Sequence, residues 1–282
     1  MQIFLNGRFV PEKRAVVSVF DRGFLYGDGL FEAVLVHHGK TFRWEEHLQR
    51  FGHGARMLNI KIPFAAKKLR AFADELIRRN KVSSGLLRLG LSRGVGMRGY
   101  SPKGANTPTF VMSLYPLRAL ASDRTQWKVV SSSQRLPAGE PLAQFKNCNK
   151  LPQILARAEA DEAGAEEALL LNTDGFAVEG TTSNLFWMER SVVCTSPLSS
   201  GILPGVTRAL VLEVCKSLRI KTREASITLP KLKQAEGVFL SMTSRGVVGV
   251  RSLDGKRLKQ SPLPERIADG CWKIVERETS EQ

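Results

Sequence analysis

Residues 174–186 read D-G-F-A-V-E-G-T-T-S-N-L-F, and this stretch decides how the second half of the chain is interpreted. The apolar run that ends in Glu179 predicts one strand, and the run that begins at Asn184 predicts the next. A carboxylate at the end of a strand can bind a protonated pyridine nitrogen, which keeps a cofactor ring electron-poor. The residues alone also fit an ordinary hairpin with an exposed glutamate and a Ser/Thr turn.

A lysine precedes this stretch, in residues 145–152, which read F-K-N-C-N-K-L-P. Lys146 lies shortly before a helix predicted over about 150–163, in a segment with few other charges. A lysine that attacks an aldehyde must be partly neutral, and burial or a neighbouring cation favours the neutral form. A solvated surface lysine is the alternative interpretation.

Two further patterns suit a phosphate group. Residues 200–208 read S-G-I-L-P-G-V-T-R, and the helix predicted from Gly205 to about residue 218 would present the backbone N–H groups of Val206 and Thr207 to an anion. Arg50 lies on an amphipathic helix that begins near residue 45, and Thr243 adds a hydroxyl. An ordinary helix cap and a solvated helix face are the alternatives.

The remaining elements indicate a mixed α/β (α+β) protein of two domains. We expect an N-terminal α/β domain over 1–116, a linker over 117–126, and a β-rich α/β domain over 127–282 that carries the lysine. An Asn6-Gly7 turn predicts a β-hairpin at the start of the chain. Helical periodicity covers 45–58 and 65–80. The expected strands are 31–36, 86–92, 109–114, 127–133, 168–171, 176–179, 184–188 and 192–195.

Composition excludes several classes of protein. Hydrophobic residues make up 43% and charged residues 24% of the 282, which is typical of a soluble globular protein. We expect no signal peptide, no membrane span and no metal, and the four widely spaced cysteines favour a reducing cytoplasm. The net charge of +15 raises the possibility of nucleic-acid binding, but the basic residues fall in small scattered groups, which favours a basic surface.

The order of these patterns resembles fold-type IV enzymes that use pyridoxal 5′-phosphate, a family of aminotransferases and lyases. The resemblance covers about 4–255, and the strings E-G-x-x-S-N-L-F and L-P-G-x-T-R are its most specific parts. It implies a cofactor in a cleft between two domains, in a homodimer. Lys146, and not the nearby Lys150, would carry the cofactor and move protons. The other residues expected to bind the cofactor are Arg50, Glu179, Ser183, Asn184, Val206, Thr207 and Thr243.

The resemblance also bears on the substrate, which we expect to be a small anionic amine. Residues 92–101 read S-R-G-V-G-M-R-G-Y-S and are similar to a string of 4-amino-4-deoxychorismate lyases. Branched-chain aminotransferases usually carry arginine where Leu35 stands, and D-amino-acid aminotransferases carry histidine where Tyr100 stands. The residues expected to contact substrate are Tyr26, Glu32, Arg98, Tyr100 and Ser244.

These features favour a lyase that converts 4-amino-4-deoxychorismate to 4-aminobenzoate and pyruvate, a step towards folate. An aminotransferase of D-amino or branched-chain amino acids is the alternative. A basic nucleic-acid-binding protein without catalysis is the hypothesis from another class.

Overall fold

The computed structural model describes residues 1–117 and 126–280, and the chain divides into two compact units. The first unit comprises Met1–Ala119, Phe145–Asn149 and Val275–Gln282, and the second comprises Leu120–Gln144 and Lys150–Ile274. Lys146 therefore groups with the first unit, although its place in the sequence had assigned it to the C-terminal domain. Residues 118–125 of the expected linker lie outside the described residues.

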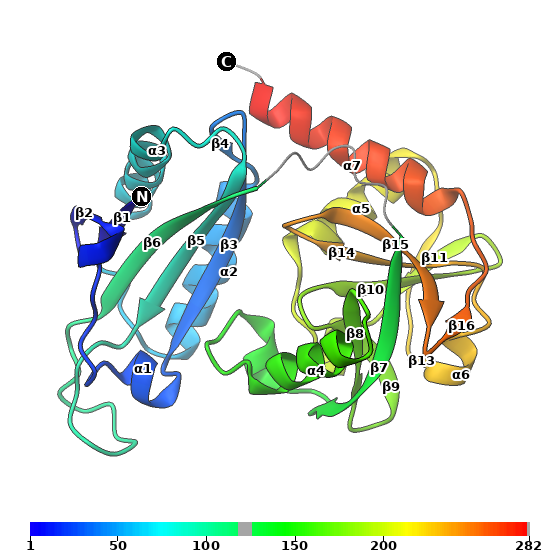
Figure 1. The fold of residues 1–282 in the computed structure, drawn as a ribbon, viewed down its shortest axis with the longest axis horizontal. Coiled ribbons are helices and arrows are strands. Elements are labelled where there is room, and N and C mark those ends of the chain that lie inside the picture. The colour runs from blue at the N-terminus through cyan, green and yellow to red at the C-terminus, as the bar shows by residue number, and fades with distance from the viewer. Residues whose placement is uncertain (118–125, 281–282) are drawn as a thin grey trace. The chain divides into compact units, whose positions relative to one another are not determined.

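The first unit is a six-stranded sheet covered by helices (Figure 1). Its strand order is β2-β1-β6-β5-β3-β4, and every pairing is antiparallel. The strands are β1 (Gln2–Leu5), β2 (Arg8–Pro11), β3 (Gly29–His37), β4 (Lys40–Thr41), β5 (Gly85–Ser92) and β6 (Thr109–Pro116). The helices are α1 (Arg22–Tyr26), α2 (Trp44–Met57) and α3 (Ala66–Asn80), with a 3-10 turn at Glu12–Arg14.

Alternation along the strands builds the core of this unit. In β5, Leu87, Leu89 and Leu91 are buried and lie in one cluster with residues of β3, β6, α2 and α3. Successive strand side chains point to opposite faces, so the two helices cover a single face of the sheet. The Asn6-Gly7 turn between β1 and β2 is confirmed, since both residues have the positive φ values, 48° and 91°, that a type I′ turn requires.

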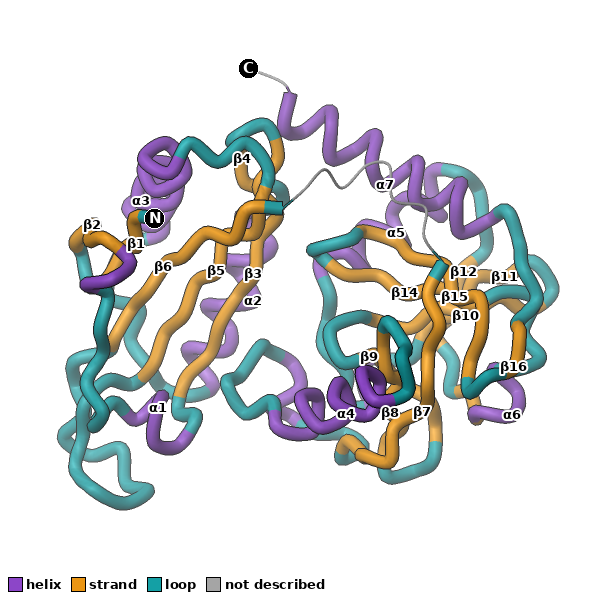
Figure 2. Tube along the Cα trace, in the orientation of Figure 1, coloured by secondary structure: helices purple, strands orange, loops and turns teal. Residues whose placement is uncertain are grey.

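The second unit is a ten-stranded mixed sheet whose central strands close into a ring (Figure 2). The ring runs β10-β14-β15-β7-β8-β9, and β9 pairs with β10 again through Glu179 and Asn184. Its strands are β7 (Trp127–Leu136), β8 (Glu167–Asn172), β9 (Phe176–Gly180), β10 (Asn184–Glu189), β14 (Val238–Met242) and β15 (Gly246–Leu253).

Shorter strands and four helices complete the second unit. The short strands are β11 (Val192–Thr195), β12 (Thr222–Glu224), β13 (Ile227–Thr228) and β16 (Lys256–Arg257), and 3-10 turns cover Pro141–Gln144 and Leu198–Ser200. The helices are α4 (Leu151–Glu162), α5 (Val206–Ser217), α6 (Leu229–Leu232) and α7 (Leu263–Ser280), whose last turns count with the first unit. The helices expected at 45–58, 65–80, 150–163 and 205–218 are confirmed, but the sequence analysis did not predict α1, α6 or α7.

Candidate active site

Lys146 is fixed to the edge of the first unit's sheet by its backbone. Its carbonyl accepts a hydrogen bond of 2.8 Å from the amide of Phe31, and the amide of Cys148 donates to Gly29 at 2.9 Å. The preceding side chain, Phe145, is fully buried against α2, where a Cβ on Gly54 would lie only 2.6 Å from its ring. The segment 145–149 therefore acts as an added edge strand, and its backbone hydrogen bonds hold Lys146 in place.

The amino group of Lys146 lies over an aromatic face. Nζ is 5.2 Å from the centroid of the Phe31 ring, and the guanidinium of Arg88 lies 3.9 Å from the same ring. Lys146 is half-buried, so its amino group is sheltered by apolar surface yet still reachable. This is an environment in which a lysine amine can serve as a nucleophile.

Arg50 belongs to a buried ion pair in the same unit. Its Nε and Nη2 donate to the two carboxylate oxygens of Glu32, at 2.7 and 2.8 Å, and His47 Nδ1 lies 2.8 Å from Oε2 of that carboxylate. Burial alone would raise the pKa of Glu32, but the charge of Arg50 and hydrogen bonds from Arg50 and His47 outweigh burial and lower it to about 2. Glu32 therefore stays ionised and fixes the orientation of Arg50.

Glu32 was expected to contact the substrate, and that role stays a prediction. The structure shows that this side chain is almost fully buried and that both of its carboxylate oxygens already have partners. Sequence reasoning missed the pairing because Glu32 and Arg50 lie 18 residues apart, on a strand and a helix.

Glu179 and Asn184 lie side by side where the ring of the second unit closes. The two residues are direct partners between β9 and β10, and Asn184 also pairs with Ser241 of β14. The Glu179 carboxylate accepts from the amide of Leu203 at 3.1 Å, while the Asn184 side chain donates to the carbonyl of Leu203 at 2.9 Å. Both predicted cofactor residues are thereby tied to the loop that leads into α5.

Helix α5 begins next to these residues without a side-chain cap. Its N-cap, Gly205, makes no capping bond, so the first-turn N–H groups at Val206 and Thr207 have no partner within the helix. A Cβ on Gly205 would clash with Oδ1 of Asn184, so a larger residue would fit there only if the Asn184 side chain moved. A helix start of this kind binds anions.

Hydroxyl groups lie at the C-terminal end of strand β14, where Ser241 pairs with Asn184. Ser241 Oγ is buried and has no hydrogen-bond partner among the described residues. Thr243 and Ser244 follow in the turn between β14 and β15, and both are half-buried. An unpartnered buried hydroxyl is costly, so this end of the sheet is suited to a polar ligand.

Glu167 supports the Thr-Thr-Ser turn, and sequence reasoning missed it. The side chain of Glu167 is buried at the start of β8, and its carboxylate accepts bonds from the hydroxyls of Thr181, Thr182 and Ser183. The sequence signal was a charged residue opening the apolar run E-A-L-L-L. Ser183, expected to bind the cofactor, is thus directed towards Glu167.

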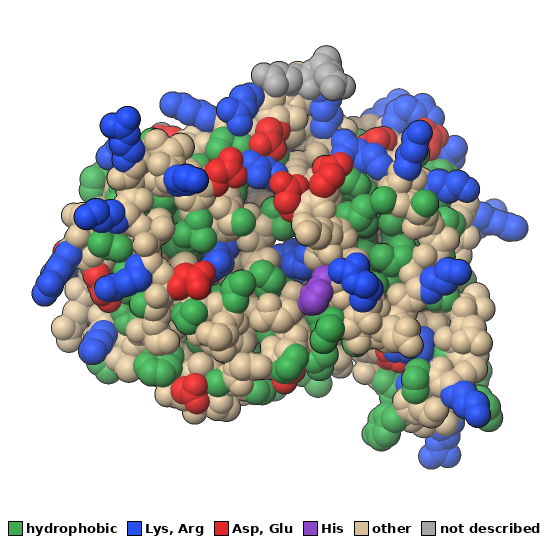
Figure 3. Space-filling view, turned by 180° about the vertical axis from the view of Figure 1, so that it is seen from behind, with side chains coloured by type: hydrophobic (Ala, Val, Ile, Leu, Met, Phe, Trp, Pro, Cys, Tyr) green, Lys and Arg blue, Asp and Glu red, His purple; other side chains and the backbone are tan. Residues whose placement is uncertain are grey.

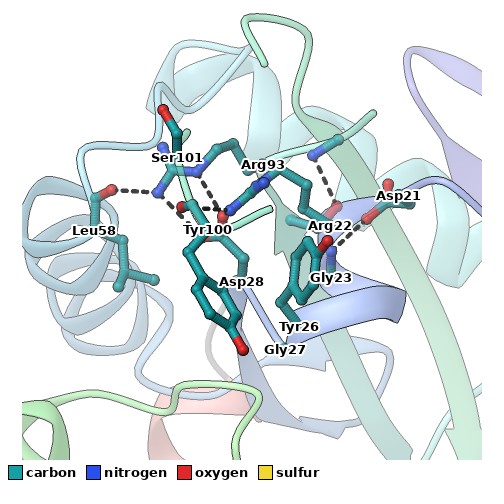
Figure 4. Close-up of polar contacts among 12 residues, drawn as sticks. Asp21, Arg22, Gly23, Tyr26, Gly27, Asp28, Leu58, Arg93, Tyr100 and Ser101 are labelled. Atoms are coloured by element: carbon teal, nitrogen blue, oxygen red, sulfur yellow. Dashed lines mark hydrogen bonds and ion pairs between the residues drawn. The ribbon is translucent and has the colours of Figure 1, made fainter. Parts of the chain in front are cut away.

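The predicted substrate string forms a loop held from α1 (Figure 4). The guanidinium of the buried Arg22 donates to the carbonyls of Gly99 and Tyr100, at 2.8 and 3.0 Å. The amide of Gly99 donates to the hydroxyl of Tyr26 at 3.0 Å, and the rings of Tyr26 and Tyr100 meet edge to face at 5.7 Å. Arg98, directly before these anchored residues, is exposed.

Asp28 joins this loop to the end of strand β5. It accepts from Arg22 at 2.9 Å and from two nitrogens of Arg93, at 2.7 and 3.0 Å, while Arg93 also donates to the carbonyl of Leu58 at 2.7 Å (Figure 4). Burial opposes ionisation of Asp28, but hydrogen bonds and charge from Arg93 and Arg22 prevail and lower its pKa. The loop 97–101 is therefore anchored on a charged network.

The surface carries the positive charge in scattered form. On the face drawn in Figure 3, Lys and Arg side chains alternate with apolar and acidic ones and form no continuous stripe. Within residues 1–117 and 126–280, no helix combines the length and apolar character that crossing a bilayer requires.

The comparisons with known proteins agree on one family. The family model described as "Amino-transferase class IV" matches residues 29–253. A Methanocaldococcus jannaschii protein provisionally named branched-chain-amino-acid aminotransferase is 36% identical over 94% of this chain and 92% of its own length. The D-alanine aminotransferase of Bacillus licheniformis is 28% identical over 99% of both chains.

Solved structures show the same fold. The crystal structure of the T.th. branched-chain amino acid aminotransferase with pyridoxamine 5′-phosphate superposes with a TM-score of 0.92, at 29% identity over all of this chain and 95% of that one. A Legionella pneumophila protein provisionally named 4-amino-4-deoxychorismate lyase gives 0.87, at 27% identity over 93% and 97%. The chain therefore belongs to the class IV aminotransferase family of pyridoxal-phosphate enzymes.

Proposed function

We propose that this enzyme is a 4-amino-4-deoxychorismate lyase, which releases 4-aminobenzoate and pyruvate. The observation that carries the proposal is the loop 97–101, in which Arg22 and Tyr26 hold the backbone of Gly99 and Tyr100, directly after the exposed Arg98. An arginine suits a carboxylate of the substrate. At the position where branched-chain aminotransferases usually carry arginine, Leu35 is buried in β3 and provides no charge.

The residues of the second unit fit the phosphate and ring of pyridoxal phosphate. The uncapped start of α5, the glycine that leaves room beside Asn184 and the unpartnered hydroxyl of Ser241 are the features that such a ligand would satisfy. We assign the phosphate to Val206, Thr207 and Thr243, and the pyridine nitrogen to Glu179. Asn184 holds the loop at Leu203, which keeps the start of α5 in place.

The first unit supplies the residues that act on the substrate. When bound, pyridoxal phosphate withdraws electrons from the substrate carbon that bears the amino group, which makes its proton acidic. Lys146 removes that proton, and Arg98 orients the substrate through its carboxylate. Loss of this proton and cleavage of the bond between the ring carbon and the ether oxygen make the ring aromatic, which supplies much of the driving force. The enolpyruvyl group leaves with the electron pair of that bond and takes up a proton to become pyruvate. Arg50, fixed by Glu32, adds a cation for the phosphate.

The cofactor assignment is tested by absorbance. The wild-type protein should show a band near the edge of the visible range that borohydride abolishes, and Lys146→Ala should lack this band. Lys150→Ala is the matched control, because Lys150 lies four residues further on at the start of α4 and should leave the band intact. A band retained in Lys146→Ala would refute the assignment of Lys146.

An aminotransferase is the second candidate, and the 36% identical M. jannaschii relative favours it. Two assays distinguish the two activities. Release of 4-aminobenzoate from aminodeoxychorismate without a keto acid acceptor identifies the lyase. Conversion of the absorbance band by an amino acid, reversed by a keto acid, identifies the aminotransferase. For either activity we propose a homodimer located in the cytoplasm.

A further inference from the structure

Two adjacent histidines at the end of strand β3 direct their rings to the same place. His37 is the last residue of β3, and adjacent residues of a strand normally point to opposite faces. His38, however, has a left-handed backbone with φ of 51°, in the turn that leads to β4. This turn brings the two rings together, with centroids 4.1 Å apart and planes at 76°.

A carboxylate from the last turns of α7 faces both rings. Oε1 of Glu276 is 3.0 Å from Nε2 of His37, and Oε2 is 3.4 Å from Nε2 of His38. One ligand atom from each of the three residues lies within 4.8 Å of the other two. All three residues belong to the first unit.

We propose that His37, His38 and Glu276 form a binding site for Zn²⁺ or a similar late first-row divalent ion. Zinc binds imidazole nitrogen and carboxylate oxygen at about 2.0–2.2 Å in a tetrahedron, so its ligand atoms lie about 3.3–3.5 Å apart. The distances of 3.0 and 3.4 Å join the two histidine Nε2 atoms to different oxygens of Glu276. One ligand atom from each residue lies within 4.8 Å of the other two, so side-chain rotations would bring both nitrogens and one oxygen to this spacing. The three residues occupy three positions, which leaves the fourth to water.

The chemistry of the set selects the class of ion. Two imidazoles and one carboxylate suit zinc, cobalt, nickel or copper, whereas Mg²⁺ and Ca²⁺ prefer all-oxygen sites. The His37 side chain is 14% exposed and that of His38 51%, so an ion can enter from solvent and still find a sheltered ligand. Arg43, the N-cap residue of α2, pairs with Glu278 at 2.8 and 3.0 Å, which balances its charge.

A bound ion would join the end of α7 to the turn between β3 and β4. Since His38 and Glu276 are far apart in sequence, the ion would bind only the folded chain and would therefore stabilise it. The inference does not depend on the proposed reaction, because none of the three residues belongs to the candidate active site.

The test is a metal titration of the holoenzyme, treated with a chelator and freed of excess cofactor by gel filtration. Calorimetry with Zn²⁺ should show one ion per chain, and Co²⁺ should produce a visible band of tetrahedral type. His38→Asn and Glu276→Gln should each weaken binding at least tenfold. Asparagine is chosen because it tolerates the left-handed backbone at this position, and glutamine keeps the shape of the glutamate.

Two control variants exclude other ligands. His53→Ala removes an exposed histidine of α2, and Cys148→Ser removes the exposed thiol; both should bind zinc like the wild type. Equal thermal unfolding of all variants in chelator would show that the substitutions left the fold intact. Absence of stoichiometric binding, or binding that survives His38→Asn and Glu276→Gln but is lost in Cys148→Ser, would overturn the proposal.

Discussion

At the scale of single residues, Glu32 is a buried carboxylate that stays ionised because of its partners. Its pKa is lowered from 4.5 to about 2, since Arg50 and His47 outweigh the effect of burial. A lowered folded-state pKa contributes stability that is fully present above the unfolded value and is lost as the pH falls. The stabilisation from Glu32 should therefore decline between about pH 4.5 and 2.

We predict that Glu32→Gln removes this pH dependence. Breaking a buried ion pair by removing one partner costs about 3–5 kcal/mol, so the variant should be less stable than the wild type at neutral pH. Its free energy of unfolding should also change less between pH 4.5 and 2 than that of the wild type. Denaturant unfolding across this range measures both effects. Glu75→Gln is the control: hydrogen bonds from Arg78 and Arg79 lower the pKa of Glu75 to about 2 as well, but solvent screens these pairs on the surface of α3, so this substitution should change stability little. If both substitutions changed the free energy of unfolding equally, the burial of the Glu32–Arg50 pair would not explain its contribution to stability.

Single residues also show what the sequence could not reveal. Lys146, Glu179 and Thr207 were predicted as site residues because short strings surround them, and local strings are readable without a structure. The partners of two other predicted cofactor residues, Glu32 for Arg50 and Glu167 for Ser183, come from distant parts of the chain. Their contacts arise only when strands and helices pack, which no local pattern records.

At the scale of elements, α1 determines the position of the loop 97–101. Arg22 donates to two carbonyls of that loop, and hydrogen bonds from a charged donor contribute about 1.5–3 kcal/mol each. We predict that Arg22→Met opens the loop at least tenfold more often, while Asp28 keeps its two bonds from Arg93. Trypsin cleavage after Arg98, identified by mass spectrometry, should accelerate by about that factor.

The matched control for the loop is Arg88→Met, which removes a guanidinium that lies over the Phe31 ring. Its cleavage rate after Arg98 should equal that of the wild type. If Arg22→Met is cleaved no faster than Arg88→Met, then Arg22 does not hold the loop.

The start of α5 gives a second prediction at this scale. In Gly205→Ala the new Cβ would clash with Asn184 Oδ1, so Asn184 must turn and lose its bond to Leu203. A lost hydrogen bond of about 1.5 kcal/mol corresponds to roughly tenfold weaker binding. Fluorescence titration of the apoenzyme with pyridoxal phosphate should show this loss.

Gly249→Ala serves as its control, because there the nearest atom is 3.4 Å away on the flexible side chain of Gln126. Cofactor affinity unchanged in Gly205→Ala would argue against α5 as the phosphate site.

The elements that the sequence predicted and those that it missed differ in a physical way. Helices α2 and α3 have long apolar stripes, and the Asn6-Gly7 turn requires positive φ, so each carries its own signal. Helix α1 has only five residues, too few for periodicity to show. Helix α7 did have a signal, the buried spacing Ile267, Cys271, Val275, which was overlooked among many charged residues.

At the scale of the whole molecule, the two units do not follow sequence order. The segment Phe145–Asn149 lies between residues of the second unit in the chain, yet it adds to the edge of β3 in the first. Reading domains as continuous ranges therefore placed Lys146 in the other unit. An edge strand held by backbone hydrogen bonds has no side-chain pattern that would reveal its partner.

The cysteines provide a test of this arrangement across the whole chain. Cys148 is exposed in the same segment as Lys146, whereas Cys194, Cys215 and Cys271 are buried. Burial raises the pKa of all three buried thiols, to about 11 for Cys215 and about 12 for Cys271. Because the thiolate is the reactive form, we predict that a thiol reagent modifies one cysteine per native chain quickly, and four after denaturation. Cys148→Ser should abolish the fast reaction, and its survival in that variant would mean that one of the three buried cysteines is accessible in solution.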